Sequence, residues 1–282
     1  MAKVEFKNED CFVTMEQMVA DGTKVGIILT SPPYATSRSN VRTKKALETY
    51  NSRYDICLDN MDEDQYVDWT IDLFNRFNTV LDKNGVILYN ISYGSENPNA
   101  MWRIPGSIIE NTDFMIADCI VWKKKSALPN NVSHNKLTRI TEFVYVICRK
   151  DEFKTFNANK QITKIGKNGQ KYYENMFNFI EAPNNDGPCD LNKATYSSDL
   201  CLQLLNIYAK EDSVVYDPFM GTGTTAIACH KFNPNDNMVC IGSELSEKQV
   251  EYSHPWRRAW SPARPGPGRA CPGPRRTSAC RG

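Results

Sequence analysis

A short run near the N-terminus, Ser31-Pro32-Pro33-Tyr34, has the composition of a rigid loop that presents hydrogen-bond acceptors. Each proline fixes its backbone φ angle and lacks an N–H donor, so carbonyl groups dominate the polar surface of the loop. The Ser31 hydroxyl and the Pro32 carbonyl could accept the two hydrogens of an exocyclic amine, which would free the nitrogen lone pair for attack on a methyl donor. Such chemistry works by positioning and electrostatics, without a covalent intermediate. A proline turn with a buried Tyr34 is the structural alternative.

A second run, Asp217-Pro218-Phe219-Met220-Gly221-Thr222-Gly223-Thr224, lies between an apolar strand segment and the start of a helix. Its glycines allow the backbone to approach a ligand closely, and the N–H groups at the helix start point toward the same place. Glu244 follows the next apolar segment, where a carboxylate can accept hydrogen bonds from both hydroxyls of a ribose. The pattern predicts a nucleotide-like cofactor at the carboxyl ends of parallel strands.

Of three other interpretations of the glycine-rich run, one is excluded and two stay open. A P-loop would need a Lys after its last glycine, but Thr224 follows Gly223. A nicotinamide fingerprint would need a third glycine, and Ala226 at that position is a tolerated variant. The run could also be a purely structural turn. The last two readings leave the run at Ser31 unexplained.

Alternating strand and helix patterns must position these two runs. Helical spacing of apolar residues predicts a helix over Glu63–Leu81 and shorter ones over Phe12–Val19 and Leu200–Tyr208. Strands are predicted at Val4–Phe6, Val25–Leu29, Val86–Tyr89, Ala117–Trp122, Phe143–Cys148, Ser213–Tyr216 and Met238–Ile241. The alternation favours an α/β domain with a largely parallel sheet. Residues 126–192 are expected to be irregular apart from the Phe143–Cys148 strand.

Taken in this order, the two runs resemble the β group of DNA amino-methyltransferases, in which the catalytic motif precedes the cofactor motif. The opposite order, with Asn-Pro-Pro-Tyr last, belongs to many RNA and protein methyltransferases. The resemblance covers nearly all of residues 1–253. It implies an α/β fold with a seven-stranded Rossmann-like sheet that binds S-adenosylmethionine (SAM), a circularly permuted motif order and an inserted target-recognition region.

The resemblance divides the chain into a catalytic half at 1–124, a target-recognition region at 125–192 with a core strand near 143–148, a SAM-binding half at 193–253 and a tail at 254–282. Ser31, Pro32, Pro33 and Tyr34 would be catalytic, with Tyr34 stacked on a flipped base. The residues implied to contact SAM are Asp10, Thr195, Tyr196, Ser197, Asp217, Pro218, Phe219, Gly221, Gly223, Thr224 and Glu244. Around Tyr196 the chain departs from the family's pattern, because no His precedes Ala194 and Tyr replaces Phe.

The residue before Pro-Pro indicates the base. In the family, Ser at that position usually accompanies N4-cytosine specificity, whereas Asp or Asn accompanies N6-adenine specificity. Ser31 therefore favours site-specific formation of N4-methylcytosine by base flipping, with N6-adenine as the alternative. A C5-cytosine enzyme would need a Pro-Cys nucleophile, and Pro188-Cys189 lies in a turn pattern instead.

Double-stranded DNA is the expected partner, within a restriction-modification system, and a homodimer is compatible with the resemblance. The chain has net charge +1, and the seven Arg of residues 254–282 leave a net charge of −6 on residues 1–253. Local basic patches must therefore contact phosphates. The predicted contacts are Lys123, Lys124, Lys125, Lys136 and Arg139, with Lys164, Lys167 and Lys171 as further candidates.

The composition changes abruptly after Ser253, where Pro, Arg, Gly and Ala replace the apolar residues of a core. Residues 254–282 are expected to be disordered, as a non-native tail or fusion scar. Ser246 and Gln249 form a capping-box pattern at the start of a helix. That helix is expected to stop at Ser253, and a shortened helix near the cofactor would impair activity.

Other classes are less favoured by composition. The ten cysteines form no Cys-x-x-Cys pair, so no metal site is predicted. No apolar run is long enough to span a membrane or to form a signal peptide, so cytoplasmic residence is expected, at the nucleoid in a prokaryote or in the nucleus of a eukaryote. A DNA-binding module without catalysis and an unrelated protein selective for NAD or ATP are the competing functions.

Overall fold

The computed structural model describes residues 2–33, 61–92, 99–127, 129–156, 158–187, 189, 191–192, 195–232 and 237–259, with side chains as far as Ser253. Tyr34 and residues 260–282 lie outside this part of the chain, so the predictions made for them are not addressed by the structure.

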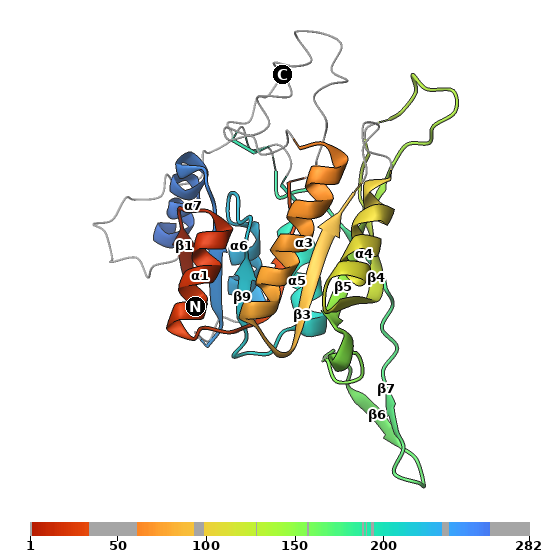
Figure 1. Ribbon diagram of the computed structural model, residues 1–282. Coiled ribbons are helices and arrows are strands. Elements are labelled where there is room, and N and C mark those ends of the chain that lie inside the picture. Colours follow the sequence, from red (N-terminus) through yellow and green to blue (C-terminus); the bar gives the residue numbers. More distant parts are fainter. Residues whose placement is uncertain are drawn as a thin grey trace, which may run out of the picture.

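An eight-stranded sheet forms the centre of the molecule, in the order β1-β10-β9-β2-β3-β5-β4-β8 (Figure 1). Among the described strands, β5 alone runs antiparallel to its neighbours in this sheet. The carboxyl ends of the other strands therefore share one edge, toward which the arrow of β3 points in Figure 1. The strands are β1 Lys3–Lys7, β2 Val25–Thr30, β3 Leu81–Ile91, β4 Phe114–Lys124, β5 Thr141–Arg149, β8 Phe179–Ala182, β9 Val214–Asp217 and β10 Val239–Ser243.

Helices cover both faces of the sheet. Helices α1 (Cys11–Asp21), α3 (Glu63–Val80) and α4 (Ala100–Asn111) contribute to one apolar core, and α5 (Ser198–Tyr208) and α6 (Thr224–Phe232) contribute to the other. The side chains of β2 alternate between these two cores, because successive residues of a strand point to opposite faces of the sheet. Ile27 and Leu29 lie in the core with α5, and Ile28 lies in the core with α3.

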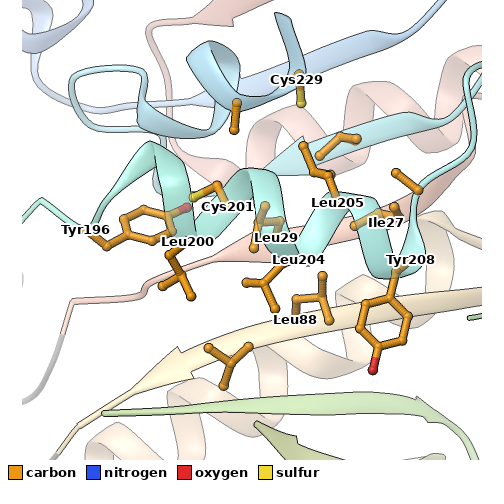
Figure 2. Packing of buried hydrophobic residues seen from close by; sticks show 14 of the residues in the cluster. Ile27, Leu29, Leu88, Tyr196, Leu200, Cys201, Leu204, Leu205, Tyr208 and Cys229 are labelled. Atoms are coloured by element: carbon orange, nitrogen blue, oxygen red, sulfur yellow. The ribbon is translucent and has the colours of Figure 1, made fainter. Parts of the chain in front are cut away.

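Helix α5 shows how firmly the second layer is held. Leu200, Leu204 and Leu205 have no exposed surface and pack with Ile27, Leu29 and Leu88 of the sheet (Figure 2). Complete burial of one leucine side chain contributes about 2 kcal/mol. This anchorage fixes Tyr196, which directly precedes the helix and enters the same core.

The predicted strands and helices are confirmed, with three corrections. Residues 126–192 are less irregular than expected: β6 (Ile162–Ile165) and β7 (Lys171–Tyr173) form a hairpin, and β8 adds an eighth strand beside β4. Helix α7 spans Glu247–Ala259 and so continues past Ser253. Helix α4 had no counterpart in the predictions, because Pro105 and Gly106 interrupt its pattern. Within the described residues no helix is long and apolar enough to cross a bilayer.

Candidate active site

The two sequence runs meet because their strands are neighbours. Strand β2 pairs in parallel with β9, with Ile28 opposite Tyr216, so the Ser31 loop and the glycine-rich turn leave the sheet side by side. The Thr30 hydroxyl donates to the Asp217 carboxylate at 2.9 Å and joins the two strand ends directly. Residues far apart in the chain thus form one site at the sheet edge.

Asp217 lies beneath this site rather than in it. Its carboxylate has no exposed surface and accepts hydrogen bonds from Thr30, from the Tyr196 hydroxyl at 3.2 Å, from the Thr225 hydroxyl at 2.5 Å and from the Phe219 N–H at 3.0 Å. Burial raises the pKa of Asp217, and these hydrogen bonds oppose that rise. The residue fixes the start of the glycine-rich turn from within, and its predicted contact with the cofactor stays a prediction.

The glycine-rich turn needs its glycines for different reasons. Gly221 has φ of +54° and Gly223 has φ of +94°, a region that favours glycine. The Gly221 N–H donates to Glu244 Oε2 at 2.8 Å, and Glu244 Oε1 accepts from the Ser246 N–H at 2.9 Å. The carboxylate is therefore held across the turn. Gly223 faces inward, where an added Cβ would lie 3.1 Å from the ring of Phe6.

A pocket opens between the two runs. Its walls come from the Ser31 loop, the glycine-rich turn, the N-terminal end of α1 and the end of β10. The predicted residues among its lining are Ser31, Pro32, Pro33, Asp10, Thr195, Tyr196, Pro218, Phe219, Gly221, Thr224 and Glu244. Asp217, Gly223 and Ser197 are not part of this lining; Ser197 is buried and caps α5 by accepting from the Asp199 N–H at 3.1 Å.

The acidic members of the pocket are held by helix ends. Asp10 caps α1, because its Oδ1 accepts from the Phe12 N–H at 2.8 Å. Glu9 accepts from the Thr14 hydroxyl at 2.8 Å. Glu244 lines the same pocket, and its N–H donates to the Lys7 carbonyl at 3.0 Å, so the neighbouring ends of β1 and β10 supply the three carboxylates. Carboxylates can accept hydrogen bonds from hydroxyl and amino groups, which suits a nucleoside.

An aromatic wall was missed by the sequence reasoning. The Tyr66 hydroxyl donates to the Pro33 carbonyl at 2.8 Å, and its ring stacks on Trp69 with centroids 5.6 Å apart. Trp69 also contacts Phe219, with centroids 5.7 Å apart, and lines the pocket. The helical spacing predicts α3, but it carries no information on which helix residues reach the Ser31 loop.

A polar network behind Ser31 was also missed. Asn90 Nδ2 donates to Ser31 Oγ at 3.3 Å and to Glu142 Oε2 at 3.1 Å. The other oxygen of Glu142 forms an ion pair with Lys124 Nζ. Asn90 is buried at the end of β3, and Glu142 lies near the start of β5, so the sheet register brings them together. Asn90 therefore orients the Ser31 hydroxyl by donating one hydrogen bond to its oxygen.

The predicted DNA contacts divide into two groups. Lys123 pairs with Glu181 at 2.6 Å, and Lys124 is engaged by Glu142 and lies 5.0 Å from the Trp122 ring centre. Lys125, Lys136 and Arg139 are exposed at the same sheet edge as Ser31. Among the described residues no His, Cys, Asp and Glu side chains cluster in a way that would hold a metal ion.

Comparison with known proteins gives the family of the chain. A sequence model of the family described as DNA methylase (N6_N4_Mtase) matches residues 25–254. The Type II methyltransferase M.Cfr9I of Citrobacter freundii is 24% identical over 151 residues, which cover 53% of this chain and 46% of that protein. The Type II methyltransferase M.BglII of Bacillus subtilis is 22% identical over 251 residues, covering 82% of this chain and 62% of that protein.

Among solved structures, the PvuII DNA methyltransferase (cytosine-N4-specific) superposes with a TM-score of 0.63 at 18% identity, over 90% of this chain and 86% of that one. This likeness confirms the predicted methyltransferase fold. The chain spans about half the length of M.Cfr9I and less than two thirds of M.BglII.

Proposed function

The chain belongs to the DNA methylase family of N6/N4 amino-methyltransferases, and from this premise we propose that it methylates the N4 amine of cytosine in double-stranded DNA. The observation that carries the proposal is the meeting of the Ser31 loop and the glycine-rich turn around one pocket. Ser31 supports cytosine, because Ser before Pro-Pro accompanies that base in the family. N6-adenine is the second candidate.

The pocket suits SAM, which supplies an electrophilic methyl group when bound. Glu244, already fixed across the turn by Gly221 and Ser246, is placed to accept hydrogen bonds from ribose hydroxyls. Asp10, which follows the neighbouring strand β1, would accept a hydrogen bond from the adenine amino group, and Phe219 would offer an apolar surface to the adenine ring. These residues would hold the cofactor so that its methyl group faces the Ser31 loop.

The Ser31 loop would act on the amine. Asn90 donates to Ser31 Oγ and orients the hydroxyl, and this oxygen would accept a hydrogen of the amine. The Pro32 carbonyl would accept the other hydrogen. Two acceptors at fixed positions favour a tetrahedral nitrogen with an available lone pair, and fixed dipoles need no reorganisation during the reaction. Tyr66 stabilises the loop through the Pro33 carbonyl.

Mass spectrometry of nucleosides tests the proposal. Genomic DNA from a host without methylation would be incubated with the protein and SAM, then digested. N4-methylcytosine is the expected product. N6-methyladenine would retain the enzyme class and overturn the meaning assigned to Ser31. Absence of both, from protein that binds SAM, would contradict the proposed activity.

The continued helix bears on the alternative of a catalytically impaired DNA-binding protein. That alternative depended on a helix that ends at Ser253, whereas α7 runs to Ala259. Gln249 on this helix lines the pocket and accepts from Asn192 Nδ2 at 3.0 Å, so α7 completes the wall beside the turn. The length of α7 supports the enzyme over the impaired DNA-binding protein, which stays the alternative. A homodimer, a partner restriction enzyme and cytoplasmic residence stay predictions.

A further inference from the structure

The proposed target-recognition region, residues 125–192, leaves the sheet at two opposite edges. Strand β4 ends at Lys124 and β5 begins at Thr141, so residues 129–140 (the 129–140 loop) project from the edge that holds Ser31. Strand β5 ends at Arg149 on the opposite edge, and the β6–β7 hairpin projects there. Figure 1 shows the hairpin extending away from the end toward which β3 points.

The base of the 129–140 loop is tied to Ser31. Lys124 precedes the loop and Glu142 follows it, and the two form an ion pair across β4 and β5. Glu142 accepts from Asn90, which donates to Ser31. The Lys124 N–H also donates to the Ile140 carbonyl at 2.8 Å. The position of the loop relative to the reacting amine is therefore determined by the same network that orients Ser31.

The surface of the loop is unusual for a polar segment. Val132 is 95% exposed and Leu137 is 89% exposed. The loop keeps its shape without them: the Asn130 N–H donates to Thr138 Oγ1 at 2.9 Å, and the Ser133 hydroxyl donates to Asn135 Oδ1 at 2.9 Å. Two large aliphatic side chains that contribute nothing to the core are suited to contact another molecule.

The charge of the loop indicates what that molecule is. Residues 129–140 contain Lys136 and Arg139 and neither Asp nor Glu, within a body whose net charge is negative. Exposed aliphatic side chains beside cations fit duplex DNA, where cations contact phosphates and apolar side chains enter between bases. Flipping a base costs a few kcal/mol of unstacking and unpairing, and an apolar side chain in the vacated space would offset part of that cost.

We propose that the 129–140 loop enters a groove of the DNA at the target base, with Leu137 and Val132 filling the space that the flipped base leaves and Lys136 and Arg139 on the flanking phosphates. The proposal rests on the proposed function. It also assigns the β6–β7 hairpin no contact with the target base, although Lys164, Lys167 and Lys171 lie on or beside it.

The test compares two double variants that remove exposed apolar side chains. Val132→Ser/Leu137→Ser alters the loop, and the matched control Ile165→Ser/Tyr173→Ser alters the hairpin, where these residues are 64% and 50% exposed. Two duplexes carry a site mapped in methylated genomic DNA. One is intact, and one has an abasic position opposite the target base, which makes flipping easier. SAM affinity is measured by calorimetry for each protein.

The loop variant should lose roughly tenfold in kcat/KM on the intact duplex, recover most of that loss on the abasic duplex and keep its SAM affinity. The hairpin variant should match the wild type on both. Equal activity of loop variant and wild type on the intact duplex would overturn the inference, as would an equal loss in the hairpin variant. A wild-type protein that binds SAM but methylates no DNA would overturn the proposed function itself, which separates the two failures.

Discussion

Thr30 and Asp217, which are 187 positions apart in the chain, share a hydrogen bond of 2.9 Å inside the core. Thr30 is the last residue of β2 before the Ser31 loop, and Asp217 is the last residue of β9 before the glycine-rich turn. Neither residue has exposed surface. The bond therefore sets the distance between the residues that would hold the amine and those that would hold the methyl donor.

Thr30→Val should destabilise the protein by about 1–3 kcal/mol, because the change keeps the side-chain shape and removes one donor from the buried Asp217 carboxylate. Chemical denaturation monitored by circular dichroism measures the free energy of unfolding. Thr163→Val on the exposed hairpin is the control and should have little effect. Equal stability of Thr30→Val and wild type would show that the other three donors suffice.

Ser31→Ala should reduce kcat by about 10²-fold and leave SAM affinity unchanged, because it removes an acceptor that acts on the amine and not on the cofactor. Single-turnover methylation and calorimetry provide the two values. A large loss of SAM binding would assign Ser31 to the cofactor instead.

Asn90→Ala should lower kcat with little change in KM or SAM affinity, because Ser31 would keep its hydroxyl and lose its alignment. Glu142→Gln should retain most of the activity, since the amide oxygen still accepts from Asn90 while the ion pair with Lys124 is lost. If Asn90 positions Ser31, the kcat of Asn90→Ala should be clearly lower than that of Glu142→Gln. If the ion pair between Glu142 and Lys124 were what matters, Glu142→Gln would lose at least as much kcat.

Glu244→Ala should weaken SAM binding by about 10- to 100-fold, because a carboxylate that accepts hydrogen bonds is worth about 1.5–3 kcal/mol. Glu251→Ala, an exposed position on α7, is the charge-matched control. Calorimetry with SAM gives the result, and an unchanged affinity in Glu244→Ala would refute the ribose role.

Gly242→Ala should destabilise the protein by about 1–3 kcal/mol, since the added Cβ would lie 2.8 Å from Met220 Cβ and 2.1 Å from Met220 Cε. Gly106→Ala is the control, because no atom lies within 4 Å of its added Cβ and alanine favours the helix. In thermal unfolding, the Tm of Gly242→Ala should fall below that of the wild type, whereas the Tm of Gly106→Ala should rise or stay the same.

Much of the fold was predictable because its signals are local. Strands of parallel sheets are short and apolar, and α3 has regular helical spacing, so seven strands and most helices are confirmed. Strand β8 was missed because its four residues, Phe179–Ala182, alternate between exposed and buried positions and include Glu181, so they form no apolar run like that of β9. The end of α7 was mispredicted because the change in composition after Ser253 was interpreted as the end of the helix, which runs to Ala259.

For the site, contiguous residues carry the signals of the proposed chemistry: an acceptor-rich proline loop, a glycine-rich turn and an acidic strand end, in the order typical of the family. Such signals are visible without a fold. The burial of Asp217 and Ser197 next to the pocket, and the contacts of Asn90, Glu142 and Trp69 with it, became visible only in the folded chain. Their roles come from sheet register and helix packing, which join side chains whose positions in the chain bear no fixed relation to one another.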